Sequence, residues 1–404
     1  MEKLTADIVV IGGGIAGLWT LAELRLAGYE AVLFEKDKLG CMQTLASQGM
    51  IHGGQRYFLQ GNANAHGESL SAMPKIWDQA FSGAGKLNLS GTKILSDDQF
   101  MWSPGGLAAN VTSFFASKTM NAKMKHLDAE DLPEVFKNQK KFKGLVYRMS
   151  EVVIDTQSLM EAFRSQFGEY IFSGEVVGLS HENQRIDSIQ VNLSNEVIRV
   201  EAKQYIFAAG RGNEFAVEAL GLNHDGPKTQ RRPLKQVLIK GRKERFYGHC
   251  ITVDPRPRMT ISAHHSKGED YWYLGGIVAE YGIDKDDQKA LSHAKKELHV
   301  LFPWLQWEHT SLATMFIDRA EPYAKVGFFK EGPQFLKQSN ALIVWPTKLT
   351  FAPSVAKIAG EWVVENRASS PALVASSEMF AKLPKAQVAD YPWDHLEYFP
   401  WESL

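Results

Sequence analysis

The feature that most constrains this chain is a glycine run close to its start, Gly12-Gly13-Gly14-Ile15-Ala16-Gly17. A short β-branched apolar segment, 7–11, comes directly before it, and apolar side chains at helical spacing follow it as far as Gly28. A second apolar segment, 31–34, ends at Glu35. This order predicts a strand, a helix and a second, parallel strand, with G-x-G-x-x-G at the first turn. The chain therefore begins as a βαβ unit of the kind that binds dinucleotides.

The three glycines of this motif play different parts in binding a dinucleotide. Gly12 permits the tight turn, Gly14 lets a pyrophosphate approach the backbone, and Gly17 lets helix and strand pack closely. Ile15 and Ala16 open the helix, so their end of it presents free N–H groups and the positive end of the dipole to the phosphates. A glycine-rich turn without a ligand is the alternative, and the complete strand, helix and acid disfavour it.

The acidic residue at the end of the second predicted strand selects among dinucleotides. Glu35 is expected to accept hydrogen bonds from a ribose, and its charge would repel the 2′-phosphate of NADP. NAD and FAD remain as cofactors at this point.

Composition narrows the class further. The 404 residues are enough for about two or three domains, and a formal net charge of −1 gives no electrostatic reason to expect nucleic acid or an acidic membrane as partner. Cys41 and Cys250 form neither a C-x-x-C pair nor a metal-binding cluster, so we expect no metal and a reducing, cytoplasmic compartment. We expect no transmembrane segment, since no run of about 18 apolar residues is present. Peripheral attachment to the inner face of a membrane stays open.

The segment after Glu35 carries a more specific signal. Residues 44–57 read TLASQGMIHGGQRY. This stretch resembles the flavin-facing segment of FAD-dependent glycerol-3-phosphate dehydrogenases, and its Ile-His element is similar to that of L-2-hydroxyglutarate dehydrogenases. Residues 28–35 resemble the FAD form of the dinucleotide fingerprint. Both enzyme groups belong to the D-amino-acid-oxidase-like superfamily of flavoproteins, and the resemblance extends in pieces over most of the chain.

The resemblance implies an α/β fold: a Rossmann-like FAD-binding domain, into which an α+β substrate domain based on a β-sheet is inserted in two pieces. The expected FAD-binding pieces are 1–86, 150–225 and 314–404, and the expected substrate-domain pieces are 87–149 and 226–313. It also implies FAD as cofactor. Non-covalent binding is favoured, because the His52 segment is closer to the glycerol-phosphate type than to the Trp-His segment of dimethylglycine-dehydrogenase-like enzymes, where a histidine carries the flavin.

The same resemblance assigns expected cofactor contacts. Val176 stands where the family's backbone meets the adenine, the segment 204–210 looks like the strand that returns beneath the dinucleotide, and 347–350 opens the last helix near the flavin. This last turn departs from the family, which is glycine-rich here. The full set of expected FAD contacts is Gly12, Gly14, Ile15, Ala16, Gly17, Glu35, Lys36, Thr44, Ser47, His52, Gly53, Gly54, Val176, Ala208, Ala209, Gly210, Lys348, Leu349 and Thr350.

The expected catalytic residues are His52, Arg319 and Lys348. Arg319 lies in a segment, 315–322, that looks like the family's return into the flavin site, where an arginine meets substrate or flavin; Asp318 and Glu321 could instead neutralise it. The predicted function is that of a dehydrogenase or oxidase. It would transfer hydride to FAD from a C–H bearing a hydroxyl or an amine on a small, anionic substrate, with an unknown electron acceptor.

Other functions stay open to different degrees. A flavin monooxygenase or a disulfide reductase would carry a Gly-Asp pair late in the chain, and this sequence has none. A disulfide reductase would also need a second cysteine at position 46, which is alanine. A non-catalytic or partner-dependent FAD-binding subunit is compatible with the sequence.

Two further segments give expectations about the second domain and the end of the chain. Residues 258–276 read as a β-hairpin, and the alternation of a strand sends His264 and His265 to opposite faces, so at most one of them faces the site. The tail 391–401 mixes aromatic and polar residues and is expected to pack on the surface.

Overall fold

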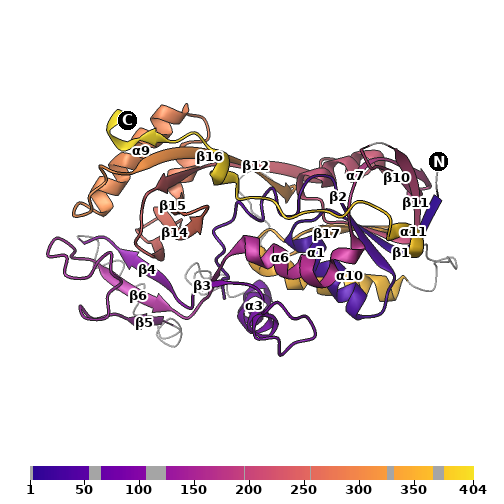
Figure 1. Cartoon of the computed structure of the whole chain (residues 1–404), viewed down its shortest axis with the longest axis horizontal. Coiled ribbons are helices and arrows are strands. Elements are labelled where there is room, and N and C mark those ends of the chain that lie inside the picture. Colours follow the sequence, from indigo (N-terminus) through magenta and orange to yellow (C-terminus); the bar gives the residue numbers. More distant parts are fainter. Residues whose placement is uncertain are drawn as a thin grey trace.

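The computed structural model describes residues 3–53, 65–105, 124–194, 196–254, 256–324, 332–366 and 377–404. These form two lobes, with the N-terminus in one and the C-terminus in the other (Figure 1). Each lobe is built around one of two large sheets. Within the described residues, no helix is both long and apolar enough to cross a membrane.

The sheet of the first lobe has a parallel centre. Its main path runs β17 (Gln334–Gln338), β18 (Ala341–Trp345), β11 (Val197–Phe207), β1 (Lys3–Ile11), β2 (Ala31–Glu35) and β8 (Ile171–Ser173). The strands β9 (Glu175–Glu182) and β10 (Arg185–Asn192) form a meander beside β11. This is the predicted Rossmann-like α/β domain.

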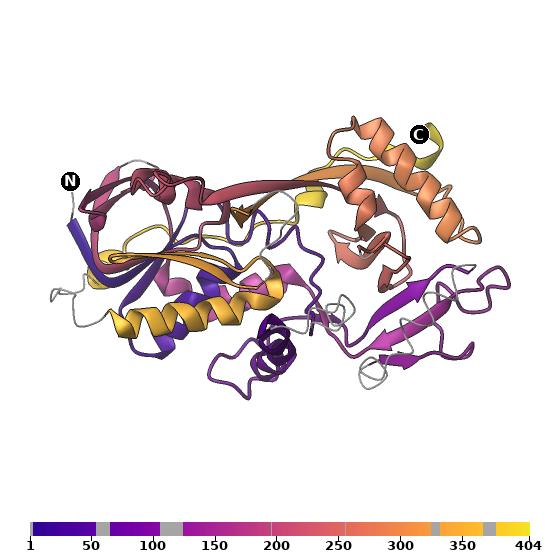
Figure 2. The ribbon, with the colours of Figure 1, turned by 180° about the vertical axis from the view of Figure 1, so that it is seen from behind.

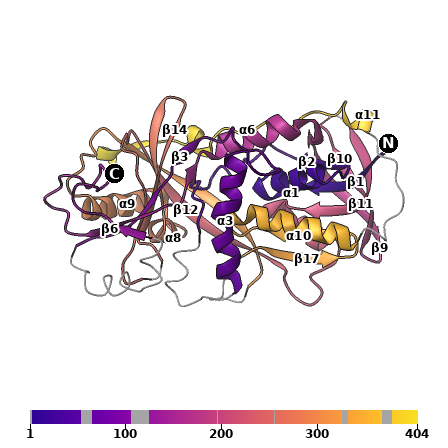
Figure 3. The ribbon, with the colours of Figure 1, turned by 90° about the horizontal axis from the view of Figure 1, so that it is seen from below.

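Both faces of this sheet are covered, which explains the continuous apolar run of β1. Ile8 and Val10 pack into one apolar core, while Val9 and Ile11 pack into the other. The first core contains α1 (Ile15–Leu26), α6 (Thr156–Phe167) and α10 (Ala352–Glu365), and Figure 3 shows α1 and α10 lying side by side. On the opposite side, α7 (Asn213–Ala219) contributes to the second core.

The sheet of the second lobe is mostly antiparallel. Its order is β19 (Phe399–Pro400), β16 (Ser311–Pro322), β12 (Thr229–Lys240), β15 (Glu269–Gly275), β14 (Met259–Ser266), β13 (Tyr247–Cys250), β4 (Gln99–Ser103), β6 (Leu145–Met149) and β5 (Met124–His126). The helices α8 (Ile277–Tyr281) and α9 (Asp287–Leu301) pack on it. The predicted hairpin is confirmed as β14 and β15. Nearer the first lobe, the short strands β3 (Ile94–Ser96) and β7 (Val153–Ile154) pair, and α3 (Ala65–Phe81) lies between the lobes (Figure 3).

The two lobes are joined by a long antiparallel ribbon. The strands β12 and β16 pair without interruption from Thr229 opposite Pro322 to Lys240 opposite Ser311. Figure 2 shows this ribbon passing from one lobe into the other. The expected boundary between residues 313 and 314 falls inside β16, so most of β16, like β19, lies in the expected FAD-binding piece 314–404 and yet joins the second sheet.

The C-terminal tail, 391–401, lies only partly at the surface: His395, Glu397 and Pro400 are exposed, while three of its rings are buried, which the expectation of surface packing did not include. Tyr391, Trp393 and Trp401 are almost fully buried. Trp393 stacks on Tyr391 at a ring-centroid distance of 4.2 Å and lies 5.1 Å from the ring of His264 on β14. The tail then pairs with β16 through β19. Its aromatic residues therefore fill space against the second sheet, where large rings bury more apolar area than any other side chains.

We predict that Trp393→Ala lowers the free energy of unfolding by about 3–5 kcal/mol, because it leaves a large cavity among buried rings. Urea denaturation followed by circular dichroism measures the change. Phe316→Ala, at a side chain that is 59% exposed, is the control and should shift stability by less than about 0.5 kcal/mol. Equal effects of the two substitutions would contradict a structural role for the tail.

Candidate functional site

The glycine turn after β1 has almost no room for side chains except at one position. A Cβ on Gly12, which has a φ of +110°, would lie 2.6 Å from the carbonyl oxygen of Ala208. A Cβ on Gly17 would lie 1.9 Å from the carbonyl oxygen of Gly12. At Gly14 the nearest atom is the hydroxyl oxygen of Thr44, at 3.3 Å. The turn is thus closed by its own backbone on two sides and is open at Gly14, where a pyrophosphate would approach.

The N-terminus of α1 is prepared for an anion. Its first turn holds no acidic residue, and Gly14 supplies no side-chain cap. The hydroxyl oxygen of Thr44 accepts the Ile15 N–H at 3.1 Å, so the Thr44 hydrogen can be donated to a phosphate. Ser47, in contrast, donates its hydroxyl to the Thr44 carbonyl at 2.8 Å. The Thr44 hydroxyl and the N–H groups at the start of α1 are thus the donors that fit the diphosphate of a dinucleotide.

Glu35 lies at the end of β2, next to the glycine turn. One carboxylate oxygen accepts the Gly13 N–H at 2.5 Å, and the other accepts the Asp37 N–H at 2.9 Å. Burial raises the pKa of this carboxyl, and the two backbone hydrogen bonds oppose that shift. Each oxygen keeps a lone pair that a ribose hydroxyl can use.

Cys41 joins Glu35 and Asp37 in a small cluster whose potential ligand atoms lie within 4.8 Å of one another. Burial and the two nearby carboxylates raise the pKa of Cys41 to about 11. Glu35, a member of this cluster, also accepts the Gly13 N–H, so the cluster lies beside the glycine turn.

Other expected cofactor contacts lie around the same sheet edge. Ala208 donates its N–H to the Ile11 carbonyl at 2.8 Å, which places the segment from Ala208 through Ala209 to Gly210 against the glycine turn. Val176 is the second residue of β9, which begins directly after Gly174, and the Gly174 N–H bonds to the Glu35 carbonyl at 2.9 Å. Lys36 is exposed and lies 3.9 Å from Glu175.

The loop 40–53 runs along the junction of the two sheets. Gln43 accepts the Ala320 N–H at 3.0 Å, and Gln48 donates to the Tyr273 carbonyl at 2.8 Å and accepts the Thr260 hydroxyl at 2.8 Å. These two glutamines were not among the expected site residues. In the sequence they are only two amides in a loop of small residues, and their partners lie more than 200 positions away along the chain.

His52 stands at the far end of this loop, among residues of both lobes. Its Nδ1 lies 3.6 Å from a carboxylate oxygen of Glu151, and its ring centroid lies 5.4 Å from that of His249 on β13. Its carbonyl accepts the hydroxyl of Thr350 at 3.2 Å. The structure therefore brings together His52 and Thr350, two of the residues expected near the flavin. Gly53 donates its N–H to Glu151 at 2.6 Å, and Gly54 lies outside the described residues.

The turn that opens the last helix adopts a glycine-like conformation without glycine. Thr347 has a φ of +59°, in the left-handed region, and its hydroxyl donates to the Gly332 carbonyl at 2.9 Å. Lys348 follows in an extended conformation, and Leu349 and Thr350 form a short 3-10 helix, η3 (Leu349–Phe351), that leads into α10. The first turn of α10 holds no acidic residue.

Arg319 lies on β16 and is the least compensated cation of its surroundings. The two acids beside it bind other arginines: Asp318 pairs with Arg231 at 2.8 Å, and Glu321 takes Arg232 in a bidentate contact of 2.6–3.0 Å. Among the described residues no ion pair includes Arg319, whose Nε donates to the Arg232 carbonyl at 3.2 Å. Burial first, and then Arg232, lower the pKa of Arg319 to about 10, so it stays charged at neutral pH.

The two hairpin histidines do lie on opposite faces, as expected. His264 is buried against Trp393, and its Nε2 lies 2.8 Å from the Ser262 hydroxyl. Burial lowers the pKa of His264 to about 4, so it is neutral. His265 is exposed and pairs with Asp270. Neither contacts the group around His52, so both are packing or surface residues.

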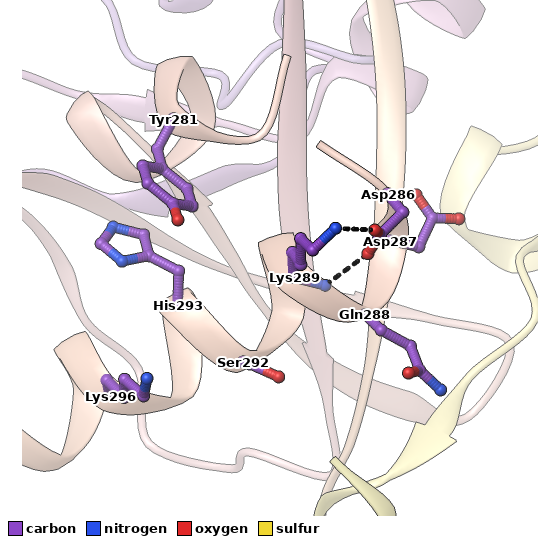
Figure 4. A pocket seen from close by; sticks show the side chains of 8 residues that line it. All are labelled: Tyr281, Asp286, Asp287, Gln288, Lys289, Ser292, His293 and Lys296. Carbon is purple, nitrogen blue, oxygen red and sulfur yellow. Dashed lines mark hydrogen bonds and ion pairs between the residues drawn. The ribbon is translucent and has the colours of Figure 1, made fainter. Parts of the chain in front are cut away.

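A pocket of about 610 Å³ opens elsewhere, on the outer side of α9 (Figure 4). The ring of Tyr281 stacks on that of His293 at 3.9 Å, and Lys289 pairs with Asp286 at 2.8 Å. Its remaining lining residues are Asp287, Gln288, Ser292 and Lys296. None of these belongs to the dinucleotide motif or to the group around His52.

Comparison with known proteins agrees with this geometry. The model of the family described as "DAO: FAD dependent oxidoreductase" matches residues 7–316. A Pseudomonas aeruginosa protein with the name "Probable FAD-dependent oxidoreductase" is 38% identical over 359 residues, which cover 88% of this chain and 90% of that protein. The crystal structure of an FAD-dependent oxidoreductase from the same organism superimposes with a TM-score of 0.79 at 32% identity, covering 98% of this chain and 99% of the other.

Two solved structures of lower identity share the fold. L-amino acid deaminase of Proteus vulgaris has a TM-score of 0.63 at 16% identity and covers 92% of each chain. The L-alpha-glycerophosphate oxidase of Mycoplasma pneumoniae, with FAD bound, has a TM-score of 0.64 at 14% identity and covers 90% of this chain and 95% of its own. The family match over residues 7–316 and the open, anion-ready turn at Gly14 lead to one conclusion: the chain belongs to the DAO family of FAD-dependent oxidoreductases, and its cofactor is FAD.

Proposed function

We propose that this oxidoreductase oxidises a small anionic substrate at a C–H bond that bears a hydroxyl or an amine. The observation that carries the proposal is the state of Arg319: a half-buried guanidinium whose flanking acids are both engaged by other arginines. A partly desolvated cation is costly unless an anion faces it, and a guanidinium binds carboxylate or phosphate through two parallel hydrogen bonds.

In this proposal, residues of the chain bind the substrate, accept its proton and stabilise charge on the cofactor. Bound FAD supplies the hydride acceptor, flavin N5. Arg319 holds the anionic group and orients the substrate, while His52 accepts the proton of the substrate hydroxyl or amine. Lys348 and the N-terminus of α10, which lacks acidic residues in its first turn, favour negative charge on the cofactor side.

The first prediction concerns the diphosphate. Gly14→Val should lower the affinity for FAD at least about tenfold, because the new side chain takes the space at the one open position of the turn. The apoprotein should stay folded, since the nearest atom is a hydroxyl that can move. Equilibrium dialysis of apoprotein with FAD measures the effect, and Gly360→Val, in open space on α10, is the matched control. Full FAD occupancy in folded Gly14→Val would refute this placement.

The second prediction concerns how FAD is attached to the protein. FAD is held without a covalent bond, because the His52 segment is of the glycerol-phosphate type and the His52 ring faces Glu151 and His249. Precipitation with trichloroacetic acid should therefore leave the yellow colour in the supernatant. Flavin that stays on the denatured wild-type protein and is lost in His52→Ala would show the opposite.

The third prediction concerns the substrate's charge. Arg319→Lys keeps the cation but loses the planar pair of donors, so kcat/KM should fall about ten- to a hundredfold, or ~1.4–3 kcal/mol, with FAD retained. A substrate is first found by following flavin bleaching under anaerobic conditions. Arg231→Lys, at an exposed arginine one strand away, is the control and should change kcat/KM less than about twofold. Unchanged efficiency in both Arg319→Lys and Arg319→Met would assign Arg319 to structure.

A further inference from the structure

Glu151 is a buried carboxylate that no step above uses. Its side chain is 2% exposed and lies just before β7, where the lobes meet. One oxygen accepts the Gly53 N–H at 2.6 Å, and the other lies 3.6 Å from Nδ1 of His52. In the described part of the chain, His52 is the one ion-pair partner of Glu151. Because a buried carboxylate needs a positive or donating partner, this placement favours His52 with its Nδ1–H directed at Glu151.

That orientation decides which nitrogen of His52 is available for chemistry. When Nδ1 carries the hydrogen that faces Glu151, Nε2 holds the lone pair of a neutral imidazole. The His52 side chain is 30% exposed and that of Glu151 only 2%, so part of the ring is accessible. Nε2 is the nitrogen that is not directed at Glu151, and we infer that it is the atom that a substrate meets.

The second lobe holds the other side of the same ring. Gln99, on β4, donates its amide hydrogen to the Val152 carbonyl at 3.3 Å, which leaves its amide oxygen to accept from Nε2 of His249 at 3.3 Å. His249 in turn places its ring 5.4 Å from that of His52. Gln99 and His249 are both buried. His52 thus has a buried carboxylate and the ring of a buried histidine as neighbours, and both restrict its rotation.

We propose that Glu151 is a positioning residue that holds His52 as the proton acceptor of the oxidation; this rests on the function proposed above. As the substrate's C–H hydride leaves for FAD, the O–H or N–H proton passes to His52 Nε2, and the carbon forms a double bond to oxygen or nitrogen. The substrate loses two electrons and two hydrogens. Glu151 stabilises the imidazolium that results, while His249 limits the directions that Nε2 can face.

The first test needs no substrate. Diethyl pyrocarbonate modifies the lone-pair nitrogen of histidine, and peptide mass spectrometry of the holoenzyme at pH 8 gives a rate for each histidine. In Glu151→Gln the rate at His52 should fall at least about threefold, because a neutral amide no longer holds Nδ1–H in place. The exposed His265 and His395 should react as in the wild type. Asp394→Asn, at another carboxylate whose side chain is 2% exposed, is the matched control. An unreactive wild-type His52, or equal rates with and without Glu151, would overturn the proposal.

The second test separates positioning from general structure. On the substrate found above, Glu151→Gln should lower kcat about ten- to a hundredfold in the wild-type background and less than about twofold in His52→Asn, with KM and FAD content little changed. Additive losses in the double variant would overturn the proposal. If Glu151→Gln does not accumulate as folded protein, Glu151→Asp, which withdraws the charge by one methylene, is measured with the same expectation.

The two tests also distinguish this inference from the proposed function. A His52 modification rate that depends on Glu151, together with unchanged kcat in His52→Asn, would leave Glu151 as the residue that orients His52. It would remove His52 from the reaction itself. A loss of kcat in His52→Asn without any effect of Glu151→Gln would keep His52 in the reaction and would show that Glu151 does not position it.

Discussion

The contact between the Gly17 α-carbon and the Gly12 carbonyl is the constraint on which the rest of the site depends. A Cβ on Gly17 would lie 1.9 Å from that oxygen, so no other residue lets α1 approach the end of β1 this closely. This approach fixes the direction of α1 and sets its N-terminus, where Gly14 offers no side-chain cap, at the edge of the sheet. Thr44 and Glu35 both bond to backbone of the same turn, through Ile15 and Gly13, and are placed by it. The open turn at Gly14, the Thr44 hydroxyl and the Glu35 carboxylate thus owe their positions to one steric fact.

A second constraint comes from the polar junction between the sheets. An interface that must admit a flavin cannot be closed by apolar packing alone, and here amides of the loop 40–53 bridge it. Gln43 and Gln48 form hydrogen bonds with backbone and hydroxyl groups of the second sheet. These bonds give partners to polar groups that burial would otherwise leave unpaired. Apolar packing between the lobes comes from the tail, through Trp393 and its neighbouring rings, and from side chains of the second sheet that join the first core, such as Leu238, Met315 and Ile317. Polar and apolar contacts between the two sheets are therefore made in large part by different segments.

The sequence predicts features that depend on contacts between residues near one another in the chain, and it does not predict those that depend on contacts between distant residues. The βαβ start and the 258–276 hairpin depend on neighbours in the chain, so alternation and glycine placement were sufficient to predict them. The burial of Trp393 and the partner of Glu151 depend on residues far away in sequence, and no local period encodes them. Thr347 shows an intermediate case: the glycine-rich turn of the family is missing, but its left-handed conformation is kept by a threonine whose hydroxyl bonds to Gly332. Here conformation could not be read from residue type.

Pairing also explains why one arginine of this region is suited to a ligand and its neighbour is not. Arg231 is exposed and shares two carboxylates, Glu214 and Asp318, and these hydrogen bonds raise its pKa. Arg319 is half-buried, and its pKa is lowered to about 10 because desolvation and the adjacent Arg232 outweigh the attraction of more distant acids. In the function proposed above, an incoming anion would relieve this cost at Arg319, whereas at Arg231 it would have to displace existing partners. A neutral ligand would leave the Arg319 guanidinium without a counter-charge, so the proposed site would favour anionic over neutral substrates.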